Sequence, residues 1–119
     1  MAAVKFLFDE NVPEALADAL IRQEPAIEIV CVGDETAPAK GTRDLDLLKA
    51  VEAGKWALLT LDKRTMVVHA NDHLALGNHT WGVFILRQGL SVSRYVEALV
   101  EIWACSQAEE WQDRIEWLP

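Results

Sequence analysis

Residues 55–62, KWALLTLD, contain an almost unbroken apolar run with a charged residue at each end. The run has the length of one strand, and it lacks the apolar–polar alternation of a strand with one face in water. A strand that is apolar on both faces is typical of a parallel sheet covered by helices on both sides. The stretch therefore predicts a buried strand at 56–61, with Asp62 directly at its end.

Outward from this run, apolar segments and helix-like segments alternate along the whole chain. Asn11 and Asp44 precede two of the helical patterns and are expected to cap those helices. The Trp-rich, acidic tail at 108–119 fits either a short helix or a final strand. Strands are predicted at 3–8, 27–32, 56–61 and 81–86, and helices at 12–22, 44–54, 65–76 and 91–105. This order predicts one α/β domain over residues 1–119, with a mainly parallel sheet of four or five strands.

The charge and cysteine content restrict the partners and surroundings of the chain. Nineteen Asp and Glu against eleven Lys and Arg give a net charge of −8, which disfavours simple electrostatic capture of nucleic acid. No segment approaches the ~20 apolar residues that cross a membrane, and the first residues do not resemble a signal peptide. Cys31 and Cys105 lack metal-ligand spacing, so we expect two buried free thiols in a cytoplasmic protein.

Acidic residues follow two of the predicted strands and begin the helix between them. Asp9 follows the first strand, Asp62 follows the third, and Asp44 and Asp46 open the intervening helix. Because the carboxyl ends of parallel strands share one edge of the sheet, these carboxylates are expected to converge there. Clustered carboxylates repel one another, and Mg²⁺ or Mn²⁺ is the usual counter-ion for oxygen ligands. The pattern predicts metal-assisted phosphodiester hydrolysis.

Structural roles compete with this hypothesis for each acid. Asp9 can be a turn residue, Asp44 a helix cap, and Asp46 a charge that stabilises the amino end of its helix. Between the two helix acids, Asp46 is slightly preferred as a ligand because it lies further into the first turn. Asp62 is the strongest single candidate, since a charge that ends so apolar a strand suggests a function.

Three motifs resemble the short PIN-like family found among toxin components of bacterial toxin–antitoxin systems. They are DENVP at 9–13, DLDLLKAVEAGKWALLTLD at 44–62 and WGVFILR at 81–87, and together they cover roughly the first 90 residues. The resemblance implies a three-layer, Rossmann-like PIN-like domain with a magnesium-dependent ribonuclease site. It also implies RNA as the substrate and an antitoxin protein as a partner, and it leaves a homodimer open.

The resemblance assigns roles to residues at matching positions. Asp9 and Asp62 match the metal-binding aspartates, and Asp44 or Asp46 matches the acid of the middle helix. We take Asp9, Asp46 and Asp62 as the catalytic set, with Glu10 orienting Asp9. Substrate binding is assigned to Asn11, Thr60, Lys63 and Arg64.

One position departs from the family pattern. Relatives often carry a second acid two residues after the strand-end aspartate, where this chain has Arg64. The change leaves two hypotheses open. Either metal binding is weakened and the chain is a catalytically inactive scaffold that acts through protein contacts, or Lys63 and Arg64 contact substrate phosphate.

The histidines offer a second, weaker constellation. His69 and His73 are spaced i, i+4, which would place them on one helix face and is compatible with a zinc pair. Ala70 stands where a zinc protease of the H-E-x-x-H type has its glutamate. Roles in helix packing or at the surface are therefore favoured for His69, His73 and His79, although His69 or His73 can still lie near the carboxylates.

Overall fold

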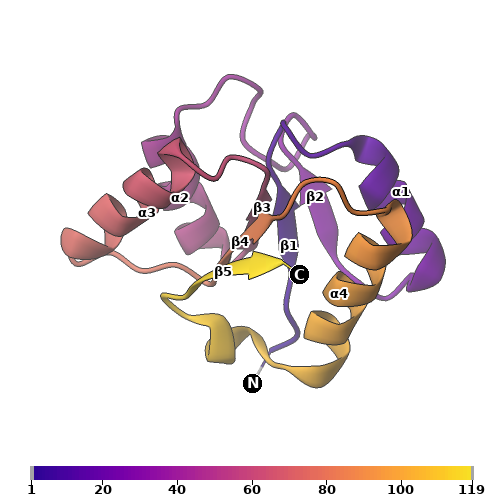
Figure 1. The fold of residues 1–119 in the computed structure, drawn as a ribbon. Helices are drawn as coiled ribbons and strands as arrows, with labels where there is room; N and C mark the ends of the chain where they lie inside the picture. The colour runs from indigo at the N-terminus through magenta and orange to yellow at the C-terminus, as the bar shows by residue number, and fades with distance from the viewer. Residues whose placement is uncertain (1, 119) are drawn as a thin grey trace.

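Short strands and longer helices alternate through residues 2–118, the part of the chain that the computed structural model describes (Figure 1). All eight strands and helices predicted between residues 3 and 105 are present, each with bounds within three residues of the prediction. In chain order the elements are β1 Phe6–Phe8, α1 Glu14–Gln23, β2 Ile29–Cys31, α2 Asp44–Gly54, β3 Ala57–Thr60, α3 Thr65–Ala75, β4 Val83–Leu86, α4 Val92–Cys105, the 3-10 helix η1 Ala108–Trp111 and β5 Ile115–Leu118.

The five strands form one sheet in the order β2-β1-β3-β4-β5, and every neighbouring pair is parallel. β3 lies at the centre, where Leu59 pairs with Phe8 of β1 and with Phe84 of β4. All four residues of β3 are buried, as the unbroken apolar run predicts. The prediction of an α/β fold with a mainly parallel sheet is confirmed.

Helices cover both faces of the sheet, which gives three layers (Figure 1). Because side chains alternate along a strand, Phe6 and Phe8 pack with α1 and α4, whereas Leu7 between them packs with α2 and α3. Each such fully buried side chain contributes about 1.5–3 kcal/mol of hydrophobic stabilisation. Two apolar cores therefore hold the sheet edges, and the loops at those edges, in fixed positions.

The helix caps differ from the sequence-based expectation. α1 begins after Pro13 and α2 after Arg43, and neither helix has a side-chain cap. The prediction that Asn11 and Asp44 are caps is therefore wrong, because both side chains bind partners from elsewhere in the fold. Both side chains therefore belong to the site described below.

The tail contains both of the structures between which its sequence could not decide. The 3-10 helix η1 precedes β5, and Trp111 of η1 packs edge-on against Phe84 at 5.0 Å between ring centroids. Both cysteines are free, but Cys31 is only partly buried and Cys105 is exposed at the end of α4, so the expectation of two buried thiols is wrong. Within residues 2–118, no helix is long and apolar enough to cross a membrane.

Candidate metal and nuclease site

The site lies where the direction of strand order reverses in the sheet. From β1 the chain crosses through α1 to β2 on one side, and β3 follows through α2 on the other side of β1. In such sheets, ligands bind outside the carboxyl ends of the two strands at this switch point. Asp9 follows β1 directly, and its amide N–H donates to the carbonyl of Leu59 in β3 at 2.9 Å. Asp9 is thus fixed between the two strand ends.

The hydroxyl group of Thr60, the last residue of β3, is the centre of a small hydrogen-bond network. It donates to Oδ2 of Asp9 at 2.9 Å and accepts from Nδ2 of Asn11 at 3.2 Å and from the backbone N–H of Asp62 at 3.1 Å. Oδ1 of Asn11 accepts from the N–H of Leu61 at 3.1 Å. Thr60 is fully buried. The structure therefore brings Asp9, Asn11, Thr60 and the backbone of Asp62 around one oxygen atom.

Asp9 is a buried carboxylate in negative surroundings. It is only 9% exposed, and burial is the main reason why the pKa of its carboxyl group is raised. The Thr60 hydroxyl and the N–H of Glu10, which donates to Oδ1 at 2.8 Å, oppose that pKa rise, whereas the charges of Asp44 and Glu10 add to it. A bound cation would relieve both the burial cost and the repulsion.

The two acids of α2 are placed differently. Asp44 is partly buried, its Oδ2 lies 2.8 Å from Nδ1 of His69 in α3, and its charge is among those that raise the pKa of Asp9. Asp46 is exposed to solvent, and its charge is not among them. Of the two acids, Asp44 is therefore the one whose charge reaches Asp9, and the preference for Asp46 as a ligand stays a prediction.

Asp62 has a structural role that sequence analysis missed. Its carboxylate accepts the backbone N–H groups of Arg64 and Thr65, each at 3.0 Å, and the hydroxyl of Thr65. The Thr65 hydroxyl is the main cause of the lowered pKa of Asp62. Asp62 therefore stabilises the amino end of α3, and the signal was present as an aspartate three residues before a threonine at a helix start. Lys63 and Arg64 are exposed beside it.

Family membership follows from the sequence itself. Residues 4–88, which run from just before β1 to just beyond β4, match the model of the family described as PIN like domain. The chain belongs to the PIN-like domain family. No curated protein and no solved structure matches it in the same comparisons. The PIN-like match includes every candidate site residue and ends before α4, η1 and β5.

The carboxylate of Glu10 binds the loop before α2 in this PIN-like domain. Its Oε1 accepts the N–H of Gly41 at 3.0 Å, which ties the loop after β1 to the loop before α2. The backbone N–H of Glu10, rather than its side chain, is what contacts Asp9. Glu10 therefore orients Asp9 through its backbone N–H and not through its carboxylate.

The three histidines pair with three different carboxylates, which leaves the hypothesis of a zinc pair without support. His69 binds Asp44, and His79 binds Asp113 at 2.8 Å. His73 is buried, and its Nε2 lies 2.9 Å from the carbonyl oxygen of His79 and 3.0 Å from Oε1 of Glu52. His73 therefore joins α3 to α2, and His69 is the histidine that touches the candidate site.

The described residues offer few side-chain ligands for a metal ion. In residues 2–118, no three His, Cys, Asp or Glu side chains are arranged to hold an ion together. Magnesium commonly binds through one or two carboxylates and keeps several waters or substrate phosphates. Asp9 and Asp44 are the two carboxylates that would have to meet that smaller requirement.

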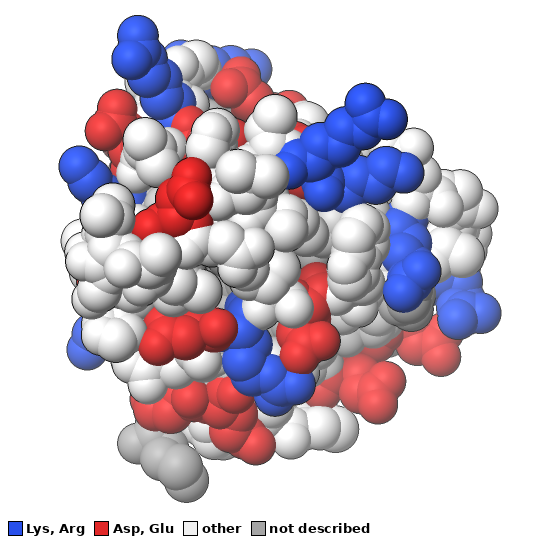
Figure 2. Space-filling model, turned by 60° about the vertical axis from the view of Figure 1, so that its left-hand side comes forward, with Lys and Arg blue, Asp and Glu red and all other residues white. Residues whose placement is uncertain are grey.

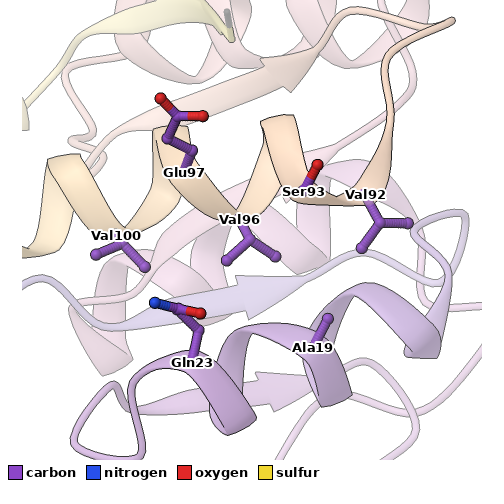
Figure 3. A pocket seen from close by; sticks show the side chains of 7 residues that line it. All are labelled: Ala19, Gln23, Val92, Ser93, Val96, Glu97 and Val100. Atoms are coloured by element: carbon purple, nitrogen blue, oxygen red, sulfur yellow. The ribbon is translucent and has the colours of Figure 1, made fainter.

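Charged side chains of both signs share the face drawn in Figure 2, where several Lys and Arg side chains adjoin one another at the upper right. A hollow of about 620 Å³ lies elsewhere, between α1 and α4, where Ala19, Val96 and Val100 are among its lining residues (Figure 3). None of the candidate site residues lines this hollow.

Proposed function

We propose that this PIN-like domain is a metal-dependent ribonuclease that hydrolyses RNA phosphodiester bonds. The observation that carries the proposal is Asp9, a buried carboxylate at the switch point of the sheet, with the charge of Asp44 nearby. The hydrogen bond from Thr60 favours the ionised form of Asp9, in which it can serve as a ligand. The fold alone would not support this, because many functions share one fold.

Asp9 and Asp44 would hold the ion, and Asp62 remains a third candidate through the backbone contact that it shares with Thr60. When bound, Mg²⁺ or Mn²⁺ would activate a water molecule and stabilise negative charge on the phosphodiester. His69 holds the Asp44 carboxylate in place from α3. The exposed Lys63 and Arg64, at the start of the same helix, would contact substrate phosphate.

Calorimetric titration with Mn²⁺ and an RNA cleavage assay test the proposal together. Wild-type protein should bind Mn²⁺ and cleave single-stranded RNA, and Asp9→Asn should lose both properties. Asp44→Asn and Asp46→Asn form a matched pair one half-turn apart on α2, and only Asp44→Asn should weaken Mn²⁺ binding. Equal cleavage by wild type and Asp9→Asn, at equal metal concentration, would contradict the assignment.

Asp62→Asn completes the set. Asparagine accepts N–H groups at a helix start about as well as aspartate, so α3 should be retained. A loss of Mn²⁺ binding in Asp62→Asn would therefore mean that Asp62 is also a ligand. Retained binding would restrict its role to α3.

The biological role we propose is that of the toxin of a toxin–antitoxin pair, on the motifs that resemble such proteins. Induced expression of the wild-type chain should arrest bacterial growth, and expression of Asp9→Asn to the same level should not. Growth arrest by both forms would remove the ribonuclease as its cause.

The second candidate is a catalytically inactive scaffold. Two observations favour it: the Asp62 carboxylate is already occupied at α3, and Arg64 stands where relatives often have an acid. Under this hypothesis the wild-type protein binds no Mn²⁺ at millimolar concentration and cleaves no RNA.

A further inference from the structure

The strand β5 forms one open edge of the sheet (Figure 1). It pairs with β4 on one side, and within residues 2–118 no strand pairs with its other side. Edge strands are commonly protected against pairing with another chain by proline, lysine, a bulge or a covering loop. β5 contains neither proline nor lysine, and its register with β4 runs through all four residues without a bulge. The family match ends at residue 88, so this edge lies outside the matched part of the chain.

The opposite edge of the sheet, β2, is closed by the chain itself. The N–H of Cys31 donates to Oδ2 of Asp34 at 2.8 Å, and the carbonyl of Cys31 accepts the N–H of Asp34 at 2.9 Å. The loop after β2 therefore satisfies the backbone groups that end this strand. The two edges thus differ, and β5 is the one that is left open.

The outward backbone groups of β5 belong to Ile115 and Trp117. The carbonyls of Arg114 and Leu118 accept the N–H groups of Val83 and Arg87 at 2.9 and 2.6 Å, so these two carbonyls face β4. Backbone groups of successive residues in a strand point to opposite edges. The N–H and C=O groups of Ile115 and Trp117 therefore point away from β4, toward a partner strand.

A second copy of β5 in antiparallel orientation matches these groups. When Glu116 of one copy stands opposite Glu116 of the other, Ile115 of each copy exchanges two hydrogen bonds with Trp117 of the other. The same register puts each Ile115 side chain opposite a Trp117 ring, and such β-branched–aromatic pairs stabilise neighbouring strands. The side chain of Trp117 is 43% exposed, so it has apolar surface to bury in this contact.

Charged side chains on the other face of β5 fit the same register. Glu116 accepts from Nε of Arg114 in its own strand at 3.0 Å, and both side chains are exposed. Two Glu116 side chains opposite each other would repel. However, Arg114 of each copy lies diagonally opposite Glu116 of the other, within reach of a long side chain. Two arginines and two glutamates then surround the two-fold axis, which offsets the repulsion.

A groove beside β5 offers further surface for a second copy. Its volume is about 330 Å³, and its mainly apolar lining includes Ile102 and Cys105 of α4, Trp111 of η1 and Leu118 of β5. One pair of short strands buries little surface, and stable interfaces usually bury more than about 1,000 Å². Contacts in this groove would add to the strand pairing, and the association should depend on concentration.

We infer that β5 is an interface at which two copies of this chain join in antiparallel orientation, so that their two sheets become one continuous sheet. The contact has closed two-fold symmetry, in which each copy presents the same residues to the other. It uses no residue of the candidate metal site and does not depend on the proposed ribonuclease function.

Sedimentation of wild type and two lysine variants tests the interface. The average mass of wild type should rise from 13.3 kDa toward twice that value with increasing concentration. Trp117→Lys places a protecting charge on the edge and should weaken dimerisation at least about tenfold, because the change occurs twice in the contact. Leu76→Lys is the matched control, since Leu76 is also exposed but lies at the end of α3. It should dimerise like wild type, and urea unfolding checks that both variants are folded.

The inference is overturned if wild type remains a monomer at about 1 mM. Dimerisation of Trp117→Lys with the affinity of wild type would also overturn it.

Charge reversal tests the antiparallel register. Arg114→Glu brings four carboxylates together in a dimer, and Glu116→Arg brings together four guanidinium groups, so each variant alone should be a monomer. An equimolar mixture places carboxylates opposite guanidinium groups and should form a heterodimer. A mixture that remains monomeric would overturn the antiparallel pairing.

Amide hydrogen exchange locates the contact directly in wild type. The N–H groups of Ile115 and Trp117 should become protected as the protein concentration rises, because only the second copy covers them. Those of Glu116 and Leu118 face β4 and should be protected at every concentration, which makes them an internal control. If wild type dimerises without added protection at Ile115 and Trp117, the interface lies elsewhere and the inference is wrong.

Discussion

Replacing Thr60 with valine tests whether the site is organised by one hydroxyl group. Valine keeps the branched shape of threonine but removes the oxygen that contacts Asp9, Asn11 and the N–H of Asp62. A hydrogen bond to a charged partner contributes about 1.5–3 kcal/mol, and the two others about 0.5–1.5 kcal/mol each before water replaces them. Because Asn11 is exposed and can bind water instead, the expected loss of unfolding free energy is about 2–4 kcal/mol.

Thr60→Ser is the matched control, since serine keeps the hydroxyl and loses only a buried methyl group, at a cost of about 1 kcal/mol. Both variants are unfolded with urea at neutral pH, where Thr60→Val should lower the midpoint by about 1–3 M. A double-mutant cycle with Asp9→Asn then isolates the contact between Thr60 and Asp9. If Thr60→Val is no less stable than Thr60→Ser, the hydroxyl is not the organising group and the reasoning fails.

Three further predictions concern separate features of the fold. Burial raises the pKa of Asp9, so the ionised carboxylate destabilises the folded state. In metal-free urea titrations at neutral pH, Asp9→Asn should therefore be more stable than wild type. This difference in stability should disappear as the pH falls through the raised pKa of Asp9 toward its ordinary value. Gly82 has φ +106°, and a Cβ there would lie 3.0 Å from Cβ of Trp111. Gly82→Ala should therefore lower the free energy of unfolding by about 1–3 kcal/mol. An unchanged melting temperature would contradict this prediction. The hydrogen bond to Asp113 is the main cause of the raised pKa of His79, so Asp113→Asn should lower that pKa in an NMR titration; a pKa equal to that of wild type would show that the pair is not formed.

The fold could be predicted from the sequence because its dominant signals are local. The unbroken run at 56–61 indicated a strand with both faces covered, and Leu58 and Leu59 do pack into opposite cores. The tail could not be assigned, because its two short elements depend on distant partners. Trp111 packs on Phe84 in β4, and β5 exists only as an edge strand paired with that same strand.

The site was predictable as a position but not as a set of contacts. Parallel-sheet logic placed Asp9 and the end of β3 on one edge, and the structure agrees. The same logic could not tell that Asn11 would bind Thr60 instead of capping α1, or that His69 would hold Asp44. Those choices depend on side-chain directions that arise only when the helices pack on the sheet.

The strongest argument that the edge of the sheet serves a function is that Asp9 is unfavourable for folding. The chain has nineteen acids, yet Asp9 is the only buried one among the residues that the structure describes. A buried carboxylate near other acids destabilises a fold unless something binds it, and an amide or an apolar residue would fit such a position at lower cost. Thr60 and the N–H of Glu10 reduce that cost but do not remove it, since the pKa of Asp9 remains raised. The cation that we propose beside Asp9 would offset this cost, and the Mn²⁺ titration tests it.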